Sequence, residues 1–221
     1  MQQEHASAGT PPCTNAGGDP APARSRAAFR ASDHALGAIE RCVQERRDAC
    51  IEGGEHGRVW IRPDARSYFS EVPDPSGFFG TAAPAISLSQ RMPAPSVAWR
   101  PLEDLLWIAA FHASRGRLLD RCSPFDVVQF THWPNFTRLP HNGSAMRLTA
   151  LLVRAPITIS VAYHLLHVPA EHAYQIYSAG SAAGIARVVS ATPKDIDAAP
   201  VSASRRVSGF WQKMLDRFSG L

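Results

Sequence analysis

Residues 155–186 read A-P-I-T-I-S-V-A-Y-H-L-L-H-V-P-A-E-H-A-Y-Q-I-Y-S-A-G-S-A-A-G-I-A, and this stretch decides the fold. Pro156 predicts the start of a short helix, with Thr158 or Ser160 near its beginning. His167-Val168-Pro169 predicts a break, and a second helix then runs to about residue 183. Two helices joined by such a short turn form a helix-turn-helix.

This stretch has the form of a DNA-binding motif without its charge. It contains no Lys or Arg, and its one acidic residue is Glu171. Nucleic-acid affinity comes mostly from Lys and Arg side chains that neutralise phosphates. The second helix is therefore a poor candidate for entering a major groove, and we predict that it binds another protein.

The chain on the N-terminal side predicts a small β region. Residues 1 to about 28 are rich in Ala, Pro and Gly and predict a flexible tail. Ser32 predicts the cap of a helix over about 33–50, which Gly53 and Gly54 end. The segments 58–62 and 66–70 predict a hairpin around Pro63-Asp64-Ala65, and 85–89 is a third candidate strand.

From Pro101 the apolar spacing becomes helical. It predicts a helix from Pro101 that Gly116 closes, a strand over 126–133, a helix over about 142–154 and a short strand over 187–189. Gly180 and Gly184 predict tight packing of the last helix inside the domain. Four of the five tryptophans, Trp60, Trp99, Trp107 and Trp133, are expected in the core or at a domain junction, although Trp133-Pro134-Asn135-Phe136 could also line a recognition surface.

The helices followed by a short strand resemble the winged-helix superfamily over roughly residues 101–190. R-P-L-E-D-L-L-W (100–107), T-H-W-P-N-F-T-R-L-P (131–140) and Y-S-A-G-S-A-A-G (177–184) are similar to a bacterial group in which such a domain follows a small β region. The expected fold is therefore α+β, with a small N-terminal β layer (32–100) packed on a winged-helix-like domain (101–190).

The resemblance implies which side chains the second helix exposes. In DNA-binding members this face contacts bases; here it would show Glu171, His172, Tyr174, Gln175 and Ser178. We predict that Glu171, Tyr174, Gln175 and Ser178 bind a protein partner. The alternative is a DNA-binding transcriptional regulator that uses Arg138, Arg147 and Arg154, which flank the motif.

The C-terminal segment predicts a second partner site. After a linker over 191–203, residues 204–221 predict an amphipathic helix with a complete apolar stripe. The stripe consists of Val207, Phe210, Trp211, Met214, Leu215 and Phe218. It could cover its own domain, a second copy, another protein or a bilayer surface; docking into a protein groove is the preferred interpretation, and weak association with anionic lipid is allowed.

Composition bounds the function. The formal net charge is +4 over 221 residues, and lysine occurs only at Lys194 and Lys213, a bias towards Arg that suggests a GC-rich bacterial genome. The N-terminus lacks a secretory pattern and no window is apolar enough for a membrane span, so a cytoplasmic protein is expected. Cys13, Cys42, Cys50 and Cys122 are irregularly spaced, which favours reduced thiols.

No motif indicates catalysis or a cofactor. G-x-S-x-G, H-E-x-x-H, paired carboxylates and a phosphate-binding loop are missing from the sequence. His164, His167 and His172 lack a zinc-binding pattern, and we interpret them as surface or partly buried residues. We therefore expect a non-enzymatic regulatory or scaffold protein without cofactor or metal. A small-ligand sensor that binds its ligand between the two regions is a further hypothesis.

Overall fold

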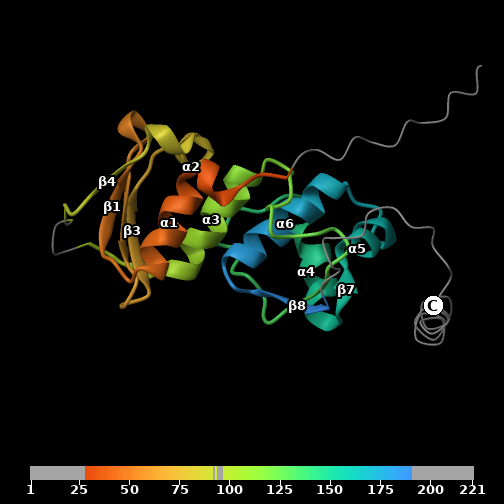
Figure 1. Ribbon diagram of the computed structural model, residues 1–221. Helices are drawn as coiled ribbons and strands as arrows, with labels where there is room; N and C mark the ends of the chain where they lie inside the picture. The colour runs from red at the N-terminus through yellow and green to blue at the C-terminus, as the bar shows by residue number, and fades with distance from the viewer. Residues whose placement is uncertain (1–27, 92, 94–96, 191–221) are drawn as a thin grey trace, which may run out of the picture.

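The computed structural model describes residues 28–91, 93 and 97–190, which form a mixed α+β fold with two antiparallel sheets (Figure 1). The expected α+β class is confirmed. The larger sheet has the order β4-β1-β2-β3-β5 and consists of β1 (Ala49–Glu52), β2 (Arg58–Arg62), β3 (Ser67–Glu71), β4 (Ser87–Ser89) and β5 (Arg100–Pro101). The smaller sheet has the order β7-β6-β8 and consists of β6 (Val127–Phe130), β7 (Ile157–Thr158) and β8 (Ala186–Ser190).

Six α-helices accompany the sheets in the described part of the chain. They are α1 (Ala35–Gln44), α2 (Pro75–Gly80), α3 (Leu102–Ser114), α4 (Ala145–Arg154), α5 (Ile159–Leu165) and α6 (Ala170–Ala182). Three short 3-10 turns lie at Ala31–Asp33, Gly54–His56 and Ala83–Ala85. Figure 1 shows α1 to α3 on one face of the five-stranded sheet, and α4 to α6 grouped with the smaller sheet at the other end of the molecule.

The predicted hairpin is confirmed as β2 and β3. Val59 and Ile61 face the helices and belong to the hydrophobic core. Trp60 points to the opposite face, where it stacks on Phe69 with the ring centroids 5.4 Å apart. Its indole N–H donates to the carbonyl of Arg91 at 2.9 Å, so the loop after β4 covers this side of the sheet. The alternation follows from the two-residue period of a strand.

The helix expected over 33–50 is shorter than predicted. It ends at Gln44, and Arg46 adopts a left-handed φ of 50°. Ala49–Glu52 instead form β1, whose first three residues are buried and which pairs with β2. The prediction was wrong because Cys50 fits the helical apolar spacing as well as it fits a strand between β2 and β4.

Helix α2 lies between the predicted hairpin and the third candidate strand, where no helix was predicted. The carboxylate of Asp74 accepts hydrogen bonds from the backbone N–H groups of Ser76 and Gly77, both at 3.0 Å, and Pro75 occupies the first helical position. These are helix-start signals. They were overlooked because Gly77 and Gly80 suggested an irregular connection.

The C-terminal elements follow the prediction more closely. Helices α3, α4 and α6 lie within three residues of their expected ends, and β8 pairs with β6 as the expected short strand. Helix α5 begins only at Ile159 because Ile157 and Thr158 first pair with β6. The Thr158 hydroxyl then accepts a hydrogen bond from the Val161 N–H at 3.4 Å. Strand β6 stops at Phe130, three residues before its expected end.

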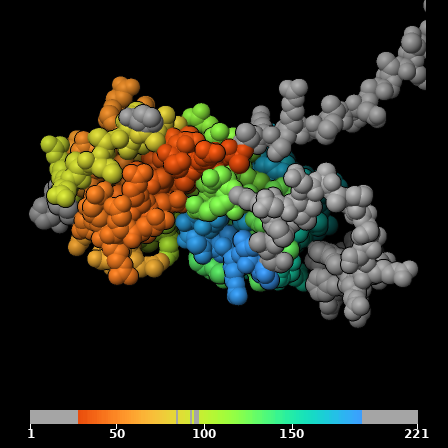
Figure 2. Space-filling view, viewed as in Figure 1, coloured from red at the N-terminus to blue at the C-terminus, as the bar shows by residue number. Residues whose placement is uncertain are grey.

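Helix α3 joins the two ends of the molecule. Leu105, Trp107 and Ala109 are fully buried, and a single hydrophobic core runs from Phe29 to Ile185. α3 packs against α1 and α2 on one side and against α6 on the other. In the space-filling view the sheet region, in orange and yellow, contacts the green and blue helical region directly (Figure 2). The regions 32–100 and 101–190 therefore share one core.

Candidate functional site

Helix α6, the expected partner-binding element, is largely covered by α3. Ser178 is fully buried; its hydroxyl accepts a hydrogen bond from the Leu119 N–H at 3.0 Å and donates to the Arg117 carbonyl at 3.3 Å. The Gln175 amide donates to the Phe111 carbonyl of α3 at 3.0 Å. The prediction that Ser178 faces a partner was wrong, because its side chain satisfies backbone groups inside the fold, whereas Gln175 is half-buried.

The other two predicted residues of α6 lie nearer to solvent. Glu171 is exposed, and its side chain lies against Gly116 at the end of α3. Tyr174 is half-buried and packs edge-to-face on Tyr163 of α5, with the centroids 6.0 Å apart. Burial, and secondarily Tyr163, raise the pKa of Tyr174 to about 12. The four residues therefore do not form one open surface.

A second polar contact anchors α6 from inside. The Tyr177 hydroxyl donates to the Asp126 carboxylate at 2.7 Å, and both residues are buried. The same carboxylate oxygen accepts the Ser123 N–H at 2.7 Å. Burial is the main cause that raises the pKa of Tyr177, so the phenol stays protonated and keeps its role as donor. Asp126 is thus a structural acid that fixes α6 to the start of β6.

The two glycines of α6 have different roles. A Cβ at Gly180 would lie 2.7 Å from Cζ of Phe130, so the predicted close packing is confirmed there, against an aromatic ring of β6. Gly184 has open space around it and a φ of +74°. Its function is to end the helix in a left-handed conformation, and the packing role predicted for it was wrong.

The three arginines of the DNA-binding alternative are on separate elements. Arg138, in the loop after β6, forms an ion pair with Asp104 of α3 at 3.0 Å. Arg147 donates to the carbonyl of Leu166 at the end of α5. Arg154 is exposed at the last position of α4. Only Arg147 and Arg154 share a helix, on which they lie seven residues apart and therefore on one face.

Helices α4 and α5 together present a surface that the sequence did not single out. Met146, Val161 and Leu165 are large aliphatic side chains with exposed fractions of 56%, 40% and 43%. Residues 155–158 connect one end of the helix pair and the bond from Arg147 to Leu166 connects the other, so the two helices run in opposite directions. We define the α4–α5 face by its exposed side chains Met146, Arg147, Arg154, Val161, His164 and Leu165.

A cavity of about 300 Å³ lies where β3, β5, α2, α3 and the loop after β6 meet. We call it the junction cleft and define it by Ser70, Phe79, Arg100, Ile108, His112 and Arg138. His112 contacts the Ser76 hydroxyl through Nδ1 at 3.1 Å and stacks on the ring of Phe79. No local sequence pattern predicts this contact, because 36 residues separate its two partners.

The Ser76–His112 contact resembles half of a hydrolase triad. In such enzymes a carboxylate binds the second nitrogen of the histidine and orients it. Among the described residues no carboxylate forms a hydrogen bond with the His112 ring, and the Asp74 carboxylate is engaged at the start of α2. We therefore interpret the pair as a structural contact beside the cleft, whose wall includes His112.

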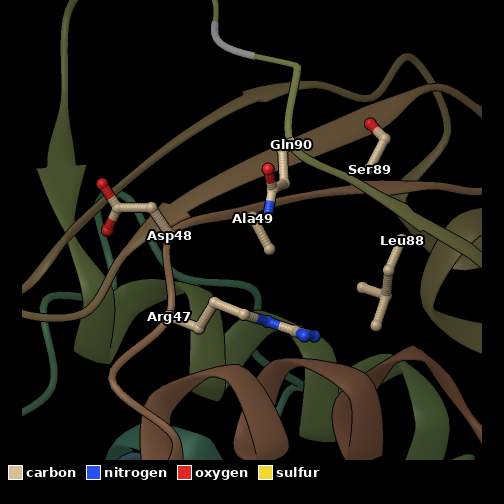
Figure 3. A pocket seen from close by; sticks show the side chains of 6 residues that line it. All are labelled: Arg47, Asp48, Ala49, Leu88, Ser89 and Gln90. Carbon is tan, nitrogen blue, oxygen red and sulfur yellow. The ribbon is translucent and has the colours of Figure 1, made fainter.

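A second cavity, of about 200 Å³, lies at the edge of the five-stranded sheet. Figure 3 shows the Arg47 guanidinium extending below Ala49 towards Leu88, whereas the Asp48 carboxylate points away. Asp48 also approaches Arg62 at 4.0 Å. Arg47 alone at an open sheet edge does not provide a convergent set of polar groups. This cavity is therefore a weaker candidate for a ligand site than the junction cleft.

The remaining sequence predictions concern tryptophans, thiols and metals. Trp60 and Trp107 are buried as expected, whereas Trp133 is 47% exposed. Cys42, Cys50 and Cys122 are buried free thiols, and burial raises the pKa of each. Within the described ranges no group of His, Cys, Asp and Glu side chains is arranged to hold a metal ion.

Two predicted segments lie outside the described residues. They are the tail up to residue 27 and the C-terminal stretch with Val207, Phe210, Trp211, Met214, Leu215 and Phe218. In the part of the chain that is described, no helix combines the length and apolarity that crossing a bilayer requires.

The comparisons with known proteins returned no match: no family model, no curated protein and no solved structure is similar to this chain.

Proposed function

We propose that this protein is a non-enzymatic regulatory or scaffold protein that binds an acidic amphipathic segment of another protein through the α4–α5 face. The observation that carries the proposal is the combination of exposed aliphatic side chains and positive charge on this face. Met146, Val161 and Leu165 provide apolar contact area. Arg147 and Arg154 are exposed on α4, the helix that carries Met146.

Charge complementarity selects the partner. Residues 127–170 contain no Asp or Glu, whereas they include Arg138, Arg147 and Arg154. A helix with leucines on one side and carboxylates at the rim would bury its apolar face on Met146 and Leu165 and pair its acids with the arginines. A basic partner would meet like charges on the same surface.

The arrangement of α4, α5 and α6 supports a winged-helix-like domain that has lost DNA reading. α5 and α6 form the helix-turn-helix, and β8 follows α6 as a short wing strand against β6. In this proposal α6 is a core helix, and the exposed interaction surface has moved to α4 and α5. The amphipathic segment expected over 204–221 would provide a second contact, and no cofactor is required.

Fluorescence anisotropy of the full chain with two labelled peptides tests the proposal. The first peptide carries leucines at helical spacing with glutamates between them, and the second carries lysines in place of the glutamates. The acidic peptide should bind, and Leu165→Glu should weaken its binding about tenfold or more, the loss expected for a buried aliphatic contact with added charge repulsion.

Leu88→Glu is the matched control, because Leu88 is a comparably exposed leucine on β4, away from the α4–α5 face. Its binding should equal that of the unmodified chain. Equal affinity for both peptides, or equal loss in Leu88→Glu and Leu165→Glu, would refute the proposed face.

The DNA-binding alternative is supported by the exposed Arg147 and Arg154 and is tested in the same assay with a labelled duplex. The engaged side chains of Gln175 and Ser178 argue against base contacts by α6. Salt-dependent binding of the duplex that Arg154→Met weakens would favour the alternative over a protein partner. No retention even at low ionic strength would remove it.

A further inference from the structure

We propose that the junction cleft binds a small organic anion, a carboxylate with a compact apolar body. The site is separate from the α4–α5 face. It would give the protein a ligand to sense, as a regulatory protein requires.

The charge of the cleft selects an anion. Arg100 and Arg138 both line it, from β5 and from the loop after β6. Asp104 pairs with Arg138 at 3.0 Å, and its charge also acts on Arg100. No described carboxylate forms an ion pair with Arg100 within 4.0 Å. No Asp or Glu is among the residues that line the cleft, so its wall favours a monoanionic ligand, and guanidinium groups bind carboxylates through paired hydrogen bonds.

The rest of the wall is apolar or uncharged. Phe79, Leu105 and Ile108 provide an apolar floor between α2 and α3. Burial lowers the pKa of His112, so its ring is neutral at pH 7 and adds no further positive charge. The Ser70 side chain on β3 also lines the cleft and can donate a hydrogen bond. This combination of an apolar floor and a few polar groups is typical of ligand sites.

The size of the cleft limits the ligand. Its volume of about 300 Å³ is at the lower end of the range for small-molecule sites, roughly 300–1,000 Å³. A single aromatic or cycloaliphatic acid fits this space, whereas a dinucleotide does not. The walls belong to the sheet region and to the helical region, so a bound ligand would contact both.

Isothermal titration calorimetry on the full chain tests the site with benzoate, cyclohexanecarboxylate and octanoate. At least one acid should bind, and its neutral amide should bind about tenfold or more weakly. Arg100→Met should raise the dissociation constant by about ten- to hundredfold, the range for losing one charge-assisted hydrogen bond. Ile108→Trp, which fills the floor and leaves both arginines in place, should abolish binding.

Arg41→Met is the matched control, because Arg41 is exposed on α1 and does not line the cleft. It should bind the acid with unchanged affinity. The assignment is overturned if none of the three acids binds more tightly than about 10 mM, if acid and amide bind equally, or if Arg41→Met loses as much affinity as Arg100→Met. Circular dichroism identifies a variant that fails to fold. If Arg100→Met or Ile108→Trp fails to fold, the other of these two substitutions decides whether the cleft binds the acid. None of these outcomes depends on the peptide assay of the α4–α5 face.

Discussion

Gly180 shows how closely α6 packs against the smaller sheet. A methyl group at this position would lie 2.7 Å from Cζ of the buried Phe130. Alanine raises helix propensity by about 1 kcal/mol over glycine, but overpacking a core costs about 1–3 kcal/mol. We expect Gly180→Ala to lower the free energy of unfolding by up to about 2 kcal/mol, as measured by urea denaturation.

Gly143→Ala is the control for this prediction. Gly143 has open space around it and no left-handed φ, so the change should alter stability by less than about 0.5 kcal/mol. A Gly180→Ala protein more stable than the parent chain would show that Phe130 can move aside, and that the glycine is not required for packing.

Two half-buried histidines, His34 and His112, predict loss of stability in mild acid. Burial, and secondarily Arg117, lower the pKa of His34, and burial lowers that of His112. The folded pKa values therefore lie below the ordinary value of 6.5, so the unfolded chain binds more protons as the pH falls below that value. Stability should be highest above pH 6.5 and decrease as the pH falls.

Urea denaturation at a series of pH values measures this effect. His112→Gln should reduce the dependence on pH, because one of the two groups is removed. The same substitution at the exposed His164 is the control. A parent chain equally stable on both sides of pH 6.5 would contradict the prediction.

At the scale of elements, the buried face of α6 can be tested with charge. Ser178 is fully buried and provides the acceptor for the Leu119 N–H. Ser178→Arg, the kind of change that would suit a DNA-reading helix, places an unpaired charge in the core. We expect it to cost about 3 kcal/mol or more in unfolding free energy.

Ala150→Arg is the matched control on α4, because Ala150 is exposed and arginine is a good helix former. Its stability should lie within about 0.5 kcal/mol of the parent chain. If Ser178→Arg were equally well tolerated, α6 would have to be more open to solvent than its contacts with α3 indicate.

The elements also show what sequence reasoning could reach. Helices α3 and α4 were predicted from their apolar spacing, with Pro101 and Gly116 marking the ends of α3, and α6 was predicted from the break at His167-Val168-Pro169. Strand β1 was missed because four residues carry too little periodicity to separate a strand from the end of a helix. Pairing with β2 and β4, which is not local in sequence, decided the outcome.

The candidate site was less predictable than the elements. The sequence shows correctly that α6 carries little charge. We took this as the sign of a surface that binds a partner, whereas burial of the helix against α3 explains the low charge more simply. Sequence periodicity cannot tell which neighbour covers a weakly amphipathic helix of Ala, Ser, Gly and Tyr. The junction cleft combines Ser70, Arg100, His112 and Arg138 from four separate segments, and no local pattern connects them.

At the scale of the whole molecule, the binding role proposed for the C-terminal segment can be separated from the stability of the core. The described core residues span Phe29 to Ile185. If the segment acts only in binding, deleting residues 204–221 should leave the melting temperature of the folded core unchanged and weaken binding of the acidic peptide. Differential scanning calorimetry and anisotropy measure the two effects. A full-length variant with Phe210, Trp211 and Leu215 changed to Ser should behave like the deletion if the apolar stripe is the relevant feature.

The position of α3 predicts that both ends of the molecule unfold together. α3 packs against α1 and α2 on one side and α6 on the other, and Trp107 at its centre is fully buried. Its indole N–H also donates to the Pro140 carbonyl at 3.0 Å. If either end of the molecule unfolded, one side of α3 would be exposed to water and the helix would lose part of its support. The other end would then lose the surface on which it packs.

We therefore expect one cooperative transition, in which the amides of β2 and α6 lose protection from hydrogen exchange at the same urea concentration. Trp107→Phe should lower both midpoints equally, because it leaves a cavity and an unpaired carbonyl in the shared helix. Phe69→Leu is the control, since Phe69 stacks on Trp60 on the far face of the sheet and should have a smaller effect. If β2 retained its protection after α6 had lost its own, the two ends would be independent domains, and a ligand in the junction cleft would then act by holding them together.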